Sequence, residues 1–160
     1  MTTTPIILIA DRDEDALKYL KEELEPTEYE LLHAKDGHEV LSIVDTQAHQ
    51  IAFAVVELEL PGVNGLHLIG RLTSQEPKPK KIIATTFLED ELLFELATHM
   101  GADAIVRKPR PEETWVGTVR QLLPDVPSWK MAPLFKPTTP KQAFSTPQTI
   151  PLRNIRLELE

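Results

Sequence analysis

Four apolar runs of this sequence each end in polar or charged side chains of types that can bind a metal ion or a phosphoryl group. In chain order these side chains are Asp11, Arg12 and Asp13, then Glu57, then Thr85 and Thr86, and finally Arg107 and Lys108. Carboxylates hold Mg²⁺ in proteins, and hydroxyl and ammonium groups contact phosphoryl oxygens. If the four run ends meet in space, they supply the groups that metal-assisted phosphoryl transfer requires.

The apolar runs alternate with segments of helical period. Continuous apolar runs are typical of strands buried on both faces, and apolar residues three and four apart indicate helices. The predicted strands are 5–10, 29–34, 51–58, 80–86 and 102–107, and the predicted helices are 13–24, 36–46, 65–74, 89–100 and 111–123. This alternation predicts an α/β fold with a doubly wound, five-stranded parallel sheet. Sites in such sheets form outside the carboxyl ends of the strands, so we expect the four run ends to converge.

Composition limits the classes of function. The chain has 160 residues, enough for one core, and its net charge of -8 disfavours general binding to nucleic acid or an anionic membrane. It contains no cysteine, which excludes disulfides and thiolate metal sites, and its histidines lack metal-ligand spacing. The apolar run near the N-terminus is too short for a signal peptide or a membrane span. We therefore expect a cytoplasmic domain without nucleic-acid or membrane partners.

Proline divides the chain near residue 124. Residues 125–160 contain six of the 14 prolines, with five basic and three acidic residues. Prolines at this density disfavour a long helix, so we interpret 1–124 as the domain and 125–160 as a proline-rich tail or linker. Apolar residues such as Trp129 leave open a tail that docks. From Ile150 onward the sequence alternates like an edge strand, which could pair with its own sheet or with another chain.

Residues 5–124 resemble the receiver domain of two-component response regulators. The matching pieces are "ILIADRDED", "VVELELPGVNGLHLI", "IIATT" and "GADAIVRKPRPEE". The resemblance implies a flavodoxin-like fold and a signalling module, not an enzyme, in which a histidine kinase phosphorylates an aspartate at the end of strand three. That phosphoacceptor position falls on Glu57. The family's strand-four hydroxyl and strand-five lysine fall on Thr86 and Lys108.

The sequence departs from the family's pattern at four positions of this site. Glu57 replaces the acceptor aspartate, and Arg12 replaces one member of the metal-holding acid pair that begins with Asp11. Phe87 replaces a small residue and narrows access, and Ile105 replaces the aromatic residue that packs against the hydroxyl in the switched state. A glutamate carries its carboxylate about 1.5 Å further, and a displacement of about 1 Å can cost on the order of a hundredfold in rate. Arg12 also puts a permanent positive charge where Mg²⁺ needs oxygen ligands.

These departures predict that Glu57 is an acid paired with Arg12 and Lys108, which take the place of a metal. Two interpretations of that cluster stay open. In the first, it is a neutralised remnant that holds the strand ends together. In the second, Glu57 with Thr86 and Lys108 imitates a phosphorylated aspartate and keeps an active-like surface permanently.

The leading hypothesis for function is a pseudo-receiver that works by protein–protein contact without phosphorylation and without a cofactor. Its partner would be a histidine kinase or a downstream signalling protein, and a homodimer stays open. The alternative is a working phosphoacceptor with Mg²⁺, in which Asp13 replaces Arg12 as a ligand, because Asp11 and Asp13 share a face of an extended chain. A second alternative is an assembly role through the tail.

Two apolar features of the sequence bear on partner surfaces. The segment "EDELLFEL", residues 89–96, has apolar residues at helical spacing, and we expect it to face the core. Trp115, in the last predicted helix, is either an anchor for a partner or a residue at the rim of the core.

Overall fold

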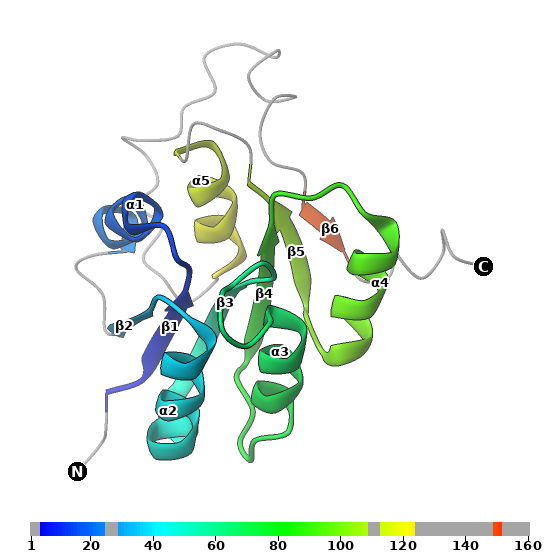
Figure 1. The fold of residues 1–160 in the computed structure, drawn as a ribbon. Coiled ribbons are helices and arrows are strands. Elements are labelled where there is room, and N and C mark those ends of the chain that lie inside the picture. The colour runs from blue at the N-terminus through cyan, green and yellow to red at the C-terminus, as the bar shows by residue number, and fades with distance from the viewer. Residues whose placement is uncertain (1–3, 25–28, 109–112, 124–148, 152–160) are drawn as a thin grey trace.

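The computed structural model describes residues 4–24, 29–108, 113–123 and 149–151 (Figure 1). Its strands are β1 (Ile6–Ala10), β2 (Glu30–Ala34), β3 (Ile51–Glu57), β4 (Lys81–Thr86), β5 (Ala104–Arg107) and β6 (Thr149–Pro151). Its helices are α1 (Glu14–Leu24), α2 (Gly37–Gln47), α3 (Gly65–Thr73), α4 (Glu91–Met100) and α5 (Glu113–Leu122), with a 3₁₀ turn, η1 (Ala48–Gln50), before β3. None of these helices has the length and apolar character needed to cross a bilayer.

The sheet has the strand order β2-β1-β3-β4-β5-β6. Its first five strands are parallel, which confirms the predicted α/β fold, and β6 is added antiparallel to β5. The sequence left open whether the tail pairs with its own sheet or with another chain, and residues 149–151 pair with the chain's own sheet, where Ile150 lies opposite Ile105. The rest of the tail, its boundary at residue 124 and the predicted assembly role lie outside the described residues.

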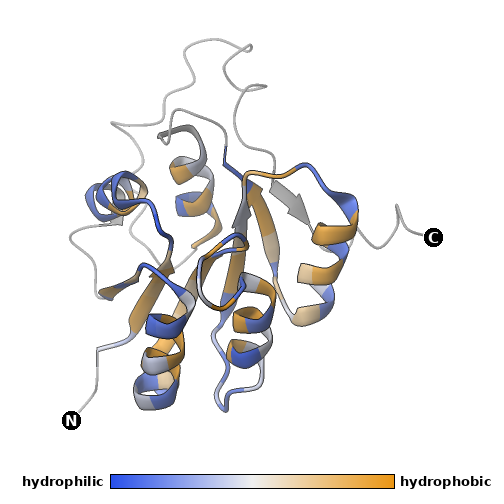
Figure 2. Cartoon of the chain, viewed as in Figure 1, coloured by the Kyte–Doolittle hydropathy of each residue, from blue (hydrophilic) through white to orange (hydrophobic). Residues whose placement is uncertain are grey.

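The helices cover both faces of the sheet (Figure 1). Val40 of α2, Leu68 of α3 and Phe94 of α4 belong to one buried cluster. Leu20 of α1 and Val119 of α5 belong to a second cluster on the opposite face. Figure 2 shows the resulting pattern, with apolar strands between helices that carry both polar and apolar residues, and with a large apolar share in α4.

Strand β1 illustrates why a continuous apolar run forms a central strand. Side chains alternate between the faces of a strand, so Ile6, Leu8 and Ala10 enter the cluster under α2, α3 and α4. Ile7 and Ile9 enter the cluster under α1 and α5. All five residues are 0% exposed, because both faces of the sheet are covered.

Helix α4 buries a narrower stripe than the sequence predicted. Its buried residues are Phe94 and Ala97, which are three apart and face the sheet. Three further apolar residues are exposed, by 61% at Leu92, 43% at Leu96 and 37% at Met100. The expectation that the segment 89–96 faces the core is wrong for Leu92 and Leu96, because they lie on the side of α4 away from the sheet, and Met100, beyond that segment, continues the same exposed side.

The turn after β3 brings α3 close to the end of the strand. Asn64 caps α3, since its side chain accepts a hydrogen bond from the backbone N–H of His67 at 3.0 Å. A Cβ on Gly65 would lie 2.5 Å from the carbonyl oxygen of Glu57. Only glycine allows this approach. The turn therefore holds the start of α3 close to Glu57, the charged residue at the end of β3.

Candidate functional site

Side chains from the carboxyl ends of β1, β3 and β5 form one buried charged cluster. Lys108 follows β5, and its Nζ lies 2.7 Å from Oδ2 of Asp11 and 3.6 Å from Oε1 of Glu57. The exposed fractions are 1% for Asp11, 0% for Glu57 and 3% for Lys108. A lysine thus reaches from one strand end to carboxylates on two others, which is the convergence that the parallel sheet predicted.

Arg12 completes the charge balance of this cluster from its solvent side. Its Nε lies 3.3 Å from Oε1 of Glu57, and its backbone N–H donates to Oε2 at 3.1 Å. Both predicted partners of Glu57 therefore lie within ion-pairing distance. The contact differs from a guanidinium fork, since one side-chain nitrogen and one backbone nitrogen hold the carboxylate. The Arg12 side chain is 51% exposed and lies over a carboxylate that is fully buried.

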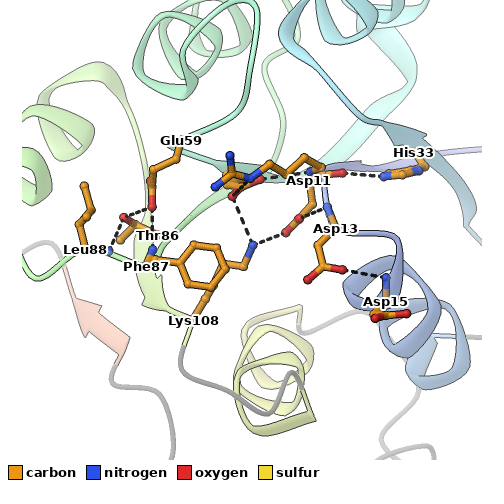
Figure 3. A network of polar contacts seen from close by, with 11 residues as sticks. Asp11, Asp13, Asp15, His33, Glu59, Thr86, Phe87, Leu88 and Lys108 are labelled. Carbon is orange, nitrogen blue, oxygen red and sulfur yellow. Dashed lines mark hydrogen bonds and ion pairs between the residues drawn. The ribbon is translucent and has the colours of Figure 1, made fainter.

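Asp11 is held by donors on both of its oxygens (Figure 3). Lys108 donates to Oδ2 at 2.7 Å, and the backbone N–H of Asp13 donates to Oδ1 at 2.8 Å. The Asp11 carbonyl lies 2.7 Å from Nε2 of His33, which ties β1 to β2. Burial raises the pKa of Asp11 above its ordinary value, and the neighbouring Lys108 opposes that rise.

Asp13 does not complete a metal site in the described part of the chain. Its carboxylate accepts a hydrogen bond from the backbone N–H of Asp15 at 2.9 Å, at the start of α1. No group of three or more His, Cys, Asp or Glu side chains among the described residues is arranged to hold a metal ion. The substitution of Asp13 for Arg12 as a ligand therefore has no geometric support in this structure.

The hydroxyl of Thr86 forms a hydrogen bond with Glu59, a residue that was not among the predicted site residues. Thr86 Oγ1 donates to Oε1 of Glu59 at 2.9 Å, and the backbone N–H of Phe87 donates to the same oxygen at 2.7 Å (Figure 3). Of the residues that the second interpretation groups with Glu57, Lys108 lies beside it, whereas the hydroxyl of Thr86 donates to Glu59. Glu57 lies opposite Thr85 in the β3–β4 register, so Glu59, two residues further on, comes level with Phe87, just beyond the end of β4. Its spacing of two from Glu57 was the signal available in the sequence.

Two aromatic rings enclose the ammonium group of Lys108. Its Nζ lies 4.5 Å from the ring centroid of Phe87 and 5.0 Å from that of Trp115, within the range of cation–π attraction. Trp115 is 1% exposed, which places it in the core rather than on a partner surface. Ile105 is also fully buried, in the cluster under α4. Phe87 is 39% exposed, and its ring lies over the ammonium group of Lys108.

The doubly wound sheet, with two acids, a lysine and an arginine in contact at its strand ends, has a flavodoxin-like architecture. The sequence pattern of the response regulator receiver domain matches residues 7–120, well over half of the chain. The chain belongs to this family.

Curated relatives and solved structures agree with that assignment. The chain is 29% identical over 103 residues to the response regulator GtcR of Aneurinibacillus migulanus, covering 64% of this chain and 41% of the relative. It is 28% identical over 117 residues to the transcriptional regulatory protein CpxR of Escherichia coli K12, covering 73% and 48%. The chain thus spans less than half the length of these two relatives.

Two solved structures show the same fold. The signal receiver domain of an HD domain-containing protein from Pseudomonas fluorescens Pf-5 superposes with a TM-score of 0.63 at 26% identity, covering 76% of this chain and 96% of that one. The phosphorylated cyanobacterial phytochrome response regulator RcpA superposes with a TM-score of 0.66 at 12% identity, covering 75% and 91%. At that identity the second likeness concerns the fold alone.

Proposed function

We propose that this receiver domain signals through protein–protein contact without accepting a phosphoryl group. The observation that carries the proposal is the pairing of Glu57 with Arg12, whose Nε and backbone N–H lie 3.3 and 3.1 Å from the two carboxylate oxygens. Oε2 accepts the hydrogen bond from the Arg12 N–H, and Oε1 accepts no hydrogen bond within the described residues but lies between the cations of Arg12 and Lys108, at 3.3 and 3.6 Å. Two neighbouring cations lower the nucleophilicity of a carboxylate. Its extra methylene also moves it from the position that an aspartate would take.

The donor set at the strand ends does not fit Mg²⁺, which the family's chemistry would use. Mg²⁺ needs a nearly ideal shell of oxygen ligands. Here the two carboxylates, Asp11 and Glu57, are balanced by two cations, Arg12 and Lys108, so the four side chains carry no net charge when all are ionised. A divalent ion would have to displace a guanidinium from Glu57 or an ammonium from Asp11. We therefore propose that this domain works without a metal cofactor.

A partner protein completes the proposal. Because the relatives are response regulators, a histidine kinase or a downstream signalling protein in the cytoplasm is the class of partner that we propose. In this scheme the domain is a binding module and not an enzyme. The competing function is a phosphoacceptor that uses Glu57 with Mg²⁺, and magnesium dependence separates the two.

The test compares amide NMR spectra with and without Mg²⁺ and beryllofluoride, a mimic of an acyl phosphate. We expect no saturable change in the wild type. In the double variant Arg12→Asp with Glu57→Asp, we expect saturable shifts around Asp11, Thr86 and Lys108, because that variant restores an acid pair and shortens the acceptor. Saturable, magnesium-dependent shifts in the wild type would overturn the proposal.

A further inference from the structure

We propose that Glu59 is a built-in anionic ligand of the turn between β4 and α4. The hydroxyl of Thr86 and the backbone N–H of Phe87 form a small anion-binding site, and the carboxylate of Glu59 fills it from the same chain. Functionally, this inference rests on the proposed function, because a domain that receives no phosphoryl group needs another anion to fix this turn. The contacts themselves do not depend on that proposal.

The first argument is the convergence of two donors on one oxygen. Oε1 of Glu59 accepts from Thr86 Oγ1 at 2.9 Å and from the Phe87 N–H at 2.7 Å. Hydrogen bonds to an ionised acceptor are shorter and stronger than bonds between neutral groups. A hydroxyl and a backbone N–H directed at a single oxygen are also how proteins hold an oxyanion. The donors are thus arranged for an anion, and the chain provides one.

The second argument is that the backbone fixes Glu59 in this place. Beyond the end of β3, the backbone N–H of Leu58 still donates to the carbonyl oxygen of Thr85 at 2.8 Å, which keeps the chain beside β4. Leu58 and Leu60 are only 5% and 4% exposed, so the residues on both sides of Glu59 are anchored in the core. The backbone of Glu59 is therefore fixed beside β4 before its carboxylate meets the donors, so only the rotamer freedom of the side chain remains to be lost.

The third argument concerns the other carboxylate oxygen. Oε2 of Glu59 is enclosed and accepts no hydrogen bond within the described residues. Enclosing an acceptor without a donor costs free energy, which a smaller neutral residue at this position would avoid. The bonds on Oε1 must offset this cost. If the hydrogen bonds on Oε1 offset the cost of enclosing Oε2, the carboxylate of Glu59 is held firmly and does not make an incidental surface contact.

The contact holds residues 86–88, at the end of β4 and the start of the loop that leads to α4. Besides donating to Glu59, Thr86 Oγ1 accepts a hydrogen bond from the backbone N–H of Leu88 at 3.1 Å, so Glu59 fixes residues 86–88 as one unit (Figure 3). Phe87 and Leu88 are 39% and 48% exposed in that arrangement. The ring of Phe87 also lies over Lys108. Glu59 is accordingly a positioning residue that holds this exposed apolar pair in one orientation.

Replacement of Glu59 with an externally added carboxylate tests the inference. In Glu59→Ala we expect the Phe87 amide to exchange its proton about tenfold faster or more, because it loses a bond to a charged acceptor. Acetate should restore the Phe87 and Leu88 resonances saturably, whereas chloride at the same ionic strength should not. Glu59→Gln keeps an acceptor oxygen without the charge, so its Phe87 amide should exchange at an intermediate rate.

The matched control is Glu89→Ala. Glu89 is an exposed acid in the same loop that pairs with Arg107 and makes no bond to residues 86–88. Its removal should leave the exchange rate of the Phe87 amide unchanged. Wild-type protection of that amide in Glu59→Ala, or an equal response to acetate and chloride, would overturn the inference. Because no metal or beryllofluoride is used, this result is independent of the phosphoryl test above.

Discussion

Replacing Arg12 with alanine removes the side-chain cation from the buried carboxylate of Glu57. Two unit charges 3.3 Å apart attract by about 5 kcal/mol at an effective dielectric constant of about 20. The Arg12 side chain is 51% exposed, so solvent screens the pair, and the Arg12 backbone N–H and Lys108 remain beside Glu57. We therefore expect Arg12→Ala to lower the free energy of unfolding by about 1–2 kcal/mol.

The chain offers an exposed ion pair as a matched control. Arg71 Nη2 lies 3.1 Å from Oδ1 of Asp45, and both side chains face solvent, with exposed fractions of 41% and 65%. Truncating Arg71 to alanine should cost no more than about 0.5 kcal/mol. The two arginines thus form ion pairs of similar length, and the main difference is that the carboxylate of Glu57 is buried and has Lys108 beside it as well.

Urea unfolding of single and double variants separates the pair energy from other effects of truncation. A cycle of Arg12→Ala with Glu57→Gln should give a coupling of about 1 kcal/mol or more, and a cycle of Arg71→Ala with Asp45→Asn should give a few tenths. Equal couplings in the two cycles would refute the reasoning, because Arg12 would then contribute no more than an ordinary surface charge.

Three further predictions concern the core, one turn and one carboxyl group. Phe94→Ala should lower the free energy of unfolding by about 3–4 kcal/mol, because Phe94 is buried, whereas Leu92→Ala should change it by less than about 0.5 kcal/mol, because Leu92 is exposed. If urea unfolding gives similar losses for the two variants, α4 packs differently from this structure. Gly101→Ala should cost about 1–3 kcal/mol in the same assay, since φ is +120° and the new Cβ would overlap Thr73, and a neutral effect would contradict that backbone geometry. Burial places the pKa of Asp11 above 3.8, so its contribution to stability is full below pH 3.8 and is lost as the pH rises through its folded-state pKa. A carboxyl NMR titration that gives a pKa below 3.8 would contradict this.

The alternation of strands and helices could be predicted because an unbroken apolar run indicates a strand that is buried on both faces. The unbroken run in β1 requires two covered faces, and both are covered. Helix starts were less certain because side-chain caps determine them. The side chain of Asp90 accepts from the backbone N–H groups of Leu92 and Leu93, so α4 begins at residue 91 rather than at 89. The exposed stripe of α4 could not be foreseen, because apolar residues on its two sides look alike in sequence.

The charged cluster was predictable for the same geometric reason, since residues at the ends of adjacent parallel strands must meet. Glu57, Arg12 and Lys108 lie together as the strand ends require. Glu59 was missed because it lies beyond the predicted end of the strand, although its spacing of two from Glu57 indicates the same side of the chain. The position of Phe87 over Lys108 was missed because cation–π contacts depend on side-chain orientation, which spacing does not specify.

The most direct measurement of the central claim is intact mass spectrometry of the wild type after incubation with acetyl phosphate and Mg²⁺. The Arg12→Asp, Glu57→Asp double variant serves as the positive control. We predict that the wild type keeps its unmodified mass while the double variant gains a phosphoryl group. A magnesium-dependent phosphoryl adduct on the wild type that disappears in Glu57→Gln would contradict the claim, because it would make Glu57 a working acceptor despite its pairing with Arg12.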